Sequence, residues 1–192
     1  MALNLDAIGK EITPVTHEYT WKDVVLYALG VGAGVDELTY VYENCLKVIP
    51  SFAVVVGYKL FAEFVTTSGV NLAGILHGEH DLIVHAPIPP QGDKLRTQAR
   101  ISRIYDKGES KGALVIAEGD TFSSDGRKLF TNVYTLFSRL DGGFGGPVAP
   151  KETLEFPERA PDFEELQRPS PDQPAIYRLS GDTFALHIDP DF

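Results

Sequence analysis

The chain has little of what marks secreted, membrane and nucleic-acid-binding proteins. Its single cysteine, Cys45, excludes an internal disulfide, which fits a reducing compartment. Lys and Arg number 17 against 27 Asp and Glu, and the formal net charge of -10 disfavours contact with nucleic-acid phosphates. No apolar run reaches the roughly 18 residues of a membrane span, and residues 1–15 lack the basic and apolar regions of a signal peptide. We expect neither nucleic-acid nor membrane partners.

The composition is that of an ordinary globular protein, with 43% hydrophobic and 23% charged residues. After an extended entry over residues 1–19, Thr20 and Asp23 have the spacing of a capping box. Apolar residues then recur at helical spacing as far as Gly30, which predicts a helix over 21–30. The sequence GVGAG at 30–34 follows a helix and lacks the full glycine spacing, so we exclude a dinucleotide-binding turn.

A second helix, weakened at Gly57, is predicted over the apolar run 52–65, although periodicity alone does not separate a buried helix from a strand there. Residues 39–43 are β-prone. Sequential hairpins in an antiparallel meander are expected next, because turn sequences join four long β-like runs. The expected sheet wraps a helix, which is an α+β architecture that the hot-dog fold satisfies. The β-like runs cover 75–88, 94–105, 112–123 and 127–140.

Composition divides the chain after these strands. Residues 147–173 are rich in Pro and acidic residues, which is typical of a linker. A new β-like unit starts near Pro174, and it is too short for another domain. We therefore predict an amino-terminal domain over 1–146, a linker over 147–173 and the start of a second unit over 174–192.

The histidines of HGEHDLIVH, residues 77–85, invite a metal-site interpretation. On a regular strand His77 and His85 would lie about 26 Å apart, at about 3.3 Å per residue, and His80 would face the other side. Zinc holds its ligands at about 2 Å. We therefore predict no metal.

Asp182 and His187 are the other candidates for chemistry. They are five residues apart, so both side chains could reach one water and act in general acid–base catalysis. A capped turn is the alternative, because such pairs are frequent. A nucleophilic Ser180 is excluded, since the G-x-S-x-G elbow is absent.

The segment YRLSGDTFALHIDP, residues 177–190, resembles the motif YRLSGD-x-NPLH-x-DP of the hydratase 2, or MaoC-like, family of enoyl-CoA hydratases. The resemblance extends in the same order over nearly the whole chain. It implies two tandem hot-dog units: a first, non-catalytic unit over 1–146 that binds the acyl chain, and a second unit that carries the motif. The other similar segments are YALGVGAG at 27–34, ILHGEH at 75–80, PIPPQGDKL at 87–95, DKGESKGA at 106–113 and GGFGG at 142–146.

The resemblance also implies an activity, the hydration of trans-2-enoyl-CoA to (R)-3-hydroxyacyl-CoA in fatty-acid or steroid side-chain β-oxidation. Asp182 and His187 would be the catalytic pair holding one water, with either residue as the base. Glu43 and Tyr177 match family residues and would bind substrate. No cofactor is expected beyond the CoA of the substrate. The expected partners are the acyl-CoA substrate and either a second copy in a homodimer or a separate hot-dog chain.

Two departures from the family pattern modify these expectations. Phe184-Ala185 stands where the family has Asn-Pro, so the loop before His187 is expected to differ. The chain also ends at Phe192, before the family's central catalytic helix, its remaining strands and the glycine amide of its oxyanion site. The 192-residue chain alone is therefore not expected to be a competent hydratase.

Two other functions stay open at this point. The first is a non-catalytic hot-dog module that binds acyl-CoA and pairs with a separate catalytic chain. The second is a hot-dog thioesterase, which the hydratase motif disfavours. A cytoplasmic location is expected if the source is bacterial and a peroxisomal one if it is eukaryotic, although the ending HIDPDF is not the peroxisomal S-K-L address.

Overall fold

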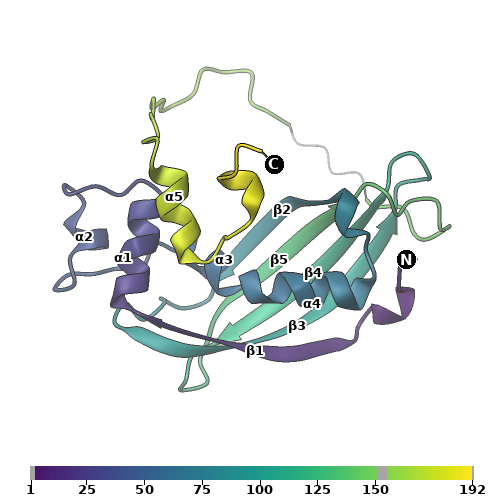
Figure 1. The fold of residues 1–192 in the computed structure, drawn as a ribbon, viewed down its shortest axis with the longest axis horizontal. Helices are drawn as coiled ribbons and strands as arrows, with labels where there is room; N and C mark the ends of the chain where they lie inside the picture. The colour runs from purple at the N-terminus through teal and green to yellow at the C-terminus, as the bar shows by residue number, and fades with distance from the viewer. Residues whose placement is uncertain (1–2, 151–154, 192) are drawn as a thin grey trace.

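An antiparallel sheet of five strands dominates the computed structural model, which describes residues 3–150 and 155–191. Part of the predicted linker and Phe192 therefore lie outside the described residues. The strands follow the spatial order β1-β3-β4-β5-β2 (Figure 1). Their bounds are β1 Glu11–Thr20, β2 Ile75–Val84, β3 Gly92–Asp106, β4 Ala113–Phe122 and β5 Lys128–Ser138.

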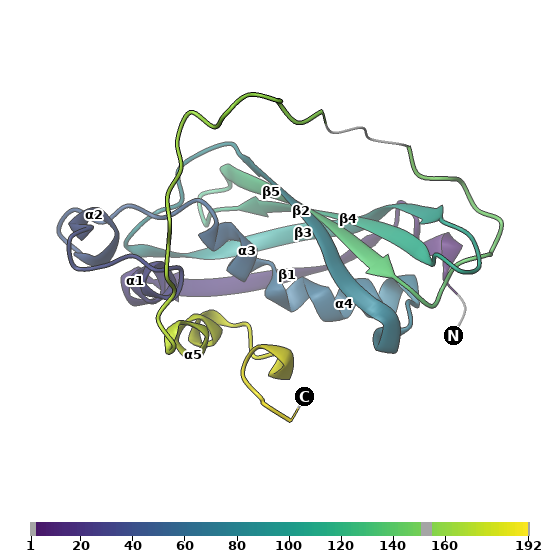
Figure 2. The ribbon, with the colours of Figure 1, turned by 90° about the horizontal axis from the view of Figure 1, so that it is seen from above.

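Helices cover one side of this sheet, as the view from above shows (Figure 2). The longest, α4, packs its buried Leu60 and Phe64 against the strands. Buried and half-buried residues alternate along the whole of β4, so every second side chain points into this core. The α+β architecture with a sheet around a helix is confirmed. The helices are α1 Trp21–Gly30, α2 Leu38–Val41, α3 Phe52–Val56, α4 Tyr58–Ser68 and α5 Gln173–Tyr177, with short 3-10 turns η1 Leu5–Ala7, η2 Leu72–Gly74, η3 Arg178–Ser180 and η4 Ala185–His187.

The two helix predictions are confirmed in detail. The Thr20 backbone N–H donates to Asp23 Oδ2 at 2.7 Å, which completes the capping box at the start of α1. Gly57 separates α3 from α4, as the weakened point in the apolar run predicted.

Two local predictions are wrong, that of the 39–43 segment and that of the strand order. Residues 39–43 do not form a strand, because the backbone closes into the helical turn α2 through a bond from Tyr42 N–H to the Leu38 carbonyl. The entry segment is extended over Glu11–Thr20, as predicted, and forms there the edge strand β1, which pairs with β3. The strands do not form a simple meander. A hairpin between β2 and β3 is not formed, because β1 pairs with the edge of β3 that β2 would need. Strand β2 pairs instead with β5 at the opposite edge of the sheet.

The carboxy-terminal segment also differs from expectation, since 174–191 contains α5, η3 and η4 and no strand. Pro174 lies in the first turn of α5, where a missing N–H has no cost. The described linker residues, 147–150 and 155–172, contain neither helix nor strand. The division into 1–146, 147–173 and 174–192 stays a prediction. Among the described residues, no helix is long and apolar enough to cross a membrane.

Candidate functional site

Asp182 and His187 lie together at the end of the described chain. His187 Nε2 is 3.7 Å from Asp182 Oδ2. Asp182 is largely buried, with 14% of its side chain exposed, whereas the His187 side chain is 53% exposed. The pair thus places an exposed imidazole nitrogen beside a largely buried carboxylate oxygen.

The local backbone explains this approach. Gly181 has φ +131°, a conformation that side chains rarely allow, and it turns the chain so that Asp182 faces α4. The Phe184 N–H then donates to Asp182 Oδ1 at 3.3 Å, and the turn η4 follows at once and ends with His187. Phe184-Ala185 in place of the family Asn-Pro therefore does not separate the pair.

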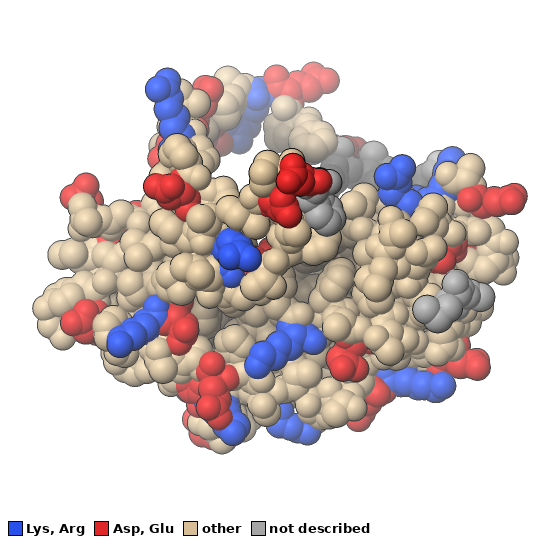
Figure 3. Space-filling model, in the orientation of Figure 1, with Lys and Arg blue, Asp and Glu red and all other residues tan. Residues whose placement is uncertain are grey.

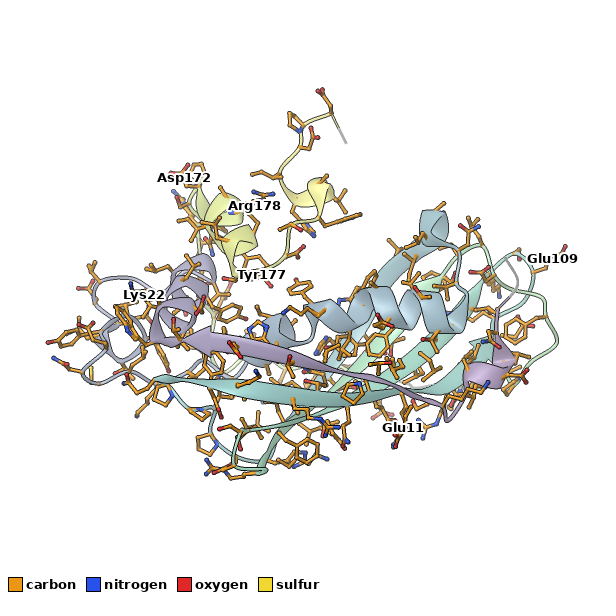
Figure 4. The ribbon with its side chains drawn as sticks, turned by 60° about the horizontal axis from the view of Figure 1, so that its bottom comes forward. Glu11, Lys22, Glu109, Asp172, Tyr177 and Arg178 are labelled. Carbon is orange, nitrogen blue, oxygen red and sulfur yellow. The ribbon has the colours of Figure 1, made fainter. Side chains whose placement is uncertain are left out.

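The motif segment is held against the first unit by close packing of α5 on α1. A Cβ on Gly30 would lie 2.9 Å from the Cα of Tyr177, so only glycine at the end of α1 permits this approach. The rings of Tyr27 and Tyr177 pack with centroids 6.0 Å apart. Figure 4 shows α5 running from Asp172, at its exposed start, towards Tyr177, which lies against the layer that contains α1. The glycine of GVGAG thus serves helix packing.

A cleft of about 330 Å³ opens beside the pair. Tyr177, the predicted substrate-binding residue, lines this cleft together with Asp182 and His187. The nitrogen Nε of Arg178 and Oγ of Ser180 are buried and make no hydrogen bond within the described residues. The full lining is Pro169, Gln173, Pro174, Tyr177, Arg178, Asp182 and His187.

Tyr58, the first residue of α4, contributes a contact that the sequence did not predict. Its hydroxyl donates to Asp182 Oδ2 at 2.6 Å and lies 3.5 Å from the Tyr177 hydroxyl. Burial, together with the hydrogen bonds to Asp182 and Tyr177, raises the pKa of Tyr58 far above its usual range. The signal in the sequence was a hydroxyl-bearing residue directly after Gly57, inside an otherwise apolar helical run.

The histidines of β2 are arranged differently from expectation. A β-bulge at Gly78 shifts the register between His77 and Glu79, so His77 and His80 face the same side, with His80 Nδ1 3.2 Å from His77 Nε2. Burial and the neighbouring His80 lower the pKa of His77, while Asp182 opposes this shift. Within the described residues, no three His, Cys, Asp or Glu side chains are grouped to hold a metal ion.

Glu43 is not brought into this group by any contact among the described residues. It lies on the exposed segment after α2, where its carbonyl accepts from Gln91 Nε2 at 3.4 Å. Its role in substrate binding stays a prediction.

On the face shown in Figure 3, the described Lys and Arg side chains are scattered among carboxylates.

Three comparisons place this chain among known proteins. The model of the MFE-2 hydratase 2 N-terminal domain matches residues 17–140. The chain is 38% identical to 3-hydroxyacyl-thioester dehydratase Y of Mycobacterium tuberculosis, over 100% of this chain and 68% of that protein. It is 37% identical to peroxisomal multifunctional enzyme type 2 of Mus musculus, over 97% of this chain and 26% of that protein. The crystal structure of a MaoC-like dehydratase from Phytophthora capsici superposes with a TM-score of 0.83 at 29% identity, covering 98% of this chain and 68% of that chain.

Proposed function

The chain belongs to the hydratase 2 family of MaoC-like enzymes, a family of lyases, and from that premise we propose that it hydrates trans-2-enoyl-CoA thioesters to (R)-3-hydroxyacyl-CoA. Relatives are named for this reaction or its reverse, among them the enoyl-CoA hydratase ChsH3 of Mycobacterium tuberculosis. Hydration and dehydration share one transition state, so both names fit one site. The reaction needs no cofactor beyond the CoA of the substrate.

The observation that carries the proposal is the pairing of Asp182 with His187 at 3.7 Å beside a cleft that Tyr177 lines. A water molecule that bridges an imidazole nitrogen and a carboxylate oxygen is held by two groups of the kinds that serve as general acid and general base in enzymes. A module that only bound acyl chains would not need both groups at one point, which favours the enzyme over that alternative.

The proposed chemistry uses both members of the pair. The oxygen of the bridging water forms a bond to C3 of the conjugated thioester, and one member of the pair accepts the water's proton. The electron pair of the C2–C3 double bond shifts towards the thioester oxygen, and the other member delivers a proton to C2. Because both groups approach from the side where the water is held, hydroxyl and proton add to the same face of the substrate.

A second hot-dog unit, in the same or another chain, is the proposed partner. Within the described residues, β2 is the last strand of the sheet and its backbone has a neighbour on one side only. The motif segment exposes Leu179, Phe184 and Leu186, each more than half accessible. Sedimentation velocity tests this proposal: the full-length protein should contain two hot-dog units per particle, as a dimer or as one longer chain, and a single-unit monomer would contradict it.

The activity is tested by incubating the full-length protein with a trans-2-enoyl-CoA and following the loss of the enoyl-thioester absorbance. Chiral chromatography of the hydrolysed product should give the (R)-3-hydroxy acid. Formation of the (S) product would contradict the stereochemical proposal. Tight binding of the thioester without turnover would instead favour the acyl-CoA-binding module.

A further inference from the structure

A hydrogen bond joins the first unit directly to the motif segment, across 124 positions of sequence. It runs from the hydroxyl of Tyr58, at the start of α4, to Oδ2 of Asp182 at 2.6 Å. The same carboxylate oxygen is the one that faces His187 Nε2 at 3.7 Å. Two side chains from different parts of the fold therefore share one oxygen of Asp182.

The direction of this bond is fixed by the chemistry of its partners. A carboxylate only accepts, so the single hydroxyl proton of Tyr58 goes to Asp182. Tyr58 can then only accept in its longer 3.5 Å contact with Tyr177, which leaves the Tyr177 hydroxyl as the donor. The result is a directed chain from Tyr177 to Tyr58 to Asp182.

The two partners of the hydrogen bond, Tyr58 and Asp182, are held in place by packing. The backbone of Gly181 lies beside Val55 of α3 and Tyr58, with an added Cβ only 3.7 Å and 3.9 Å from them. Gly57, immediately before Tyr58, is fixed between α3 and α4. The hydroxyl of Tyr58 is therefore held in place by the first unit before substrate binds.

We infer that Tyr58 is a positioning residue for catalysis, supplied by the unit otherwise expected only to bind the acyl chain, and that it holds Asp182 as an oriented carboxylate facing His187. This inference rests on the proposed function. The raised pKa of Tyr58 keeps its hydroxyl protonated in the neutral range, so it acts as a donor and not as a base. The other titratable or charged groups around Asp182 are His187, Tyr177, His77 and Arg178.

The test is Tyr58→Phe, which removes one hydroxyl and keeps the ring. Loss of a hydrogen bond to a charged group predicts that kcat falls about 10- to 100-fold while KM changes less than about threefold. Tyr105→Phe, which removes a hydroxyl on the outer face of β3, is the matched control and should leave both unchanged.

A second readout needs no turnover. The ¹³C chemical shift of the Asp182 carboxyl at a fixed neutral pH should change in Tyr58→Phe, because the carboxylate loses a hydrogen-bond donor, and should stay in place in Tyr105→Phe. An unchanged chemical shift and an unchanged kcat in the folded Tyr58→Phe variant overturn the inference, as does a loss of thermal stability with neither change. Absence of hydration by the wild-type protein contradicts the proposed function alone, because the chemical shift still tests Tyr58.

Discussion

Gly57 offers a quantitative test of how the first unit is packed around the start of α4. Its φ of -81° and ψ of -9° suit any residue, so replacement by alanine would ordinarily stabilise the protein by about 0.4–1 kcal/mol. Here a Cβ would overlap the hydroxyl oxygen of Tyr134 and lie 3.0 Å from its Cζ. Overpacking of this kind costs about 1–3 kcal/mol. The net effect of Gly57→Ala should be a destabilisation of about 1–2 kcal/mol.

The hydroxyl of Tyr134, with which the added Cβ would clash, can be removed in a separate variant. The Tyr134 hydroxyl is buried and has no hydrogen-bond partner of good geometry within the described residues, although the Asn132 amide is close enough to affect its pKa. Tyr134→Phe should therefore be nearly neutral. It should also restore more than half of the stability lost in Gly57→Ala, because the hydroxyl is the closer of the two contacts.

Urea titrations of the two single variants and the double variant measure this coupling. A loss of 1–2 kcal/mol corresponds to a fall in Tm of about 2–8 °C for a protein of this size. Gly34→Ala is the control, since its Cβ would meet nothing within 4 Å, and it should be neutral or stabilising. The reasoning is refuted if Gly57→Ala is as stable as the wild type, or if Tyr134→Phe does not reduce its effect.

Two further predictions concern a buried carboxylate and the predicted substrate contact. Asp106 is 7% exposed, and donation from the backbone N–H groups of Gly143 and Gly108 holds the pKa of its carboxyl below the usual range. A lowered folded-state value means that its stabilisation is present above the unfolded value and is lost as pH falls through the folded one. The difference in unfolding free energy between the wild type and Asp106→Asn should accordingly shrink under acid in urea titrations, and a constant difference would count against this account. For the substrate contact, Glu43→Gln should impair hydration more than Glu79→Gln, although Glu79 lies in the histidine-rich segment; equal kcat/KM values would remove Glu43 from substrate binding.

Local chemistry made parts of this fold predictable from sequence. The capping box at Thr20 and the interruption at Gly57 depend on neighbouring residues only, and both helix boundaries follow from them. The four long strands likewise appear where alternation and turn residues indicated them. Such signals are short in range, so they specify elements and not their partners.

Long-range pairing explains most of what the sequence did not show. The partner of β2 is decided by β1 occupying the edge of β3, which no local pattern in 75–88 reveals. The bulge at Gly78 reverses the face of every residue after it, which brings His80 beside His77. The contact between Tyr58 and Asp182 depends on the packing of α5 against Gly30. This is a long-range tertiary contact, which local sequence patterns do not reveal. The pairing of Asp182 with His187, in contrast, lies within six residues of chain and was accessible to motif reasoning.

The central claim is that Asp182 and His187 together hydrate an enoyl thioester. It is tested most directly by the kcat/KM of Asp182→Asn and His187→Ala in the full-length protein, beside the controls Asp162→Asn in the exposed linker and His85→Ala at the end of β2. Loss of either acid–base group predicts a fall of about 10²–10⁴-fold, with the binding of a saturated acyl-CoA retained and both controls close to the wild type. Near-normal turnover in either Asp182→Asn or His187→Ala would contradict the account.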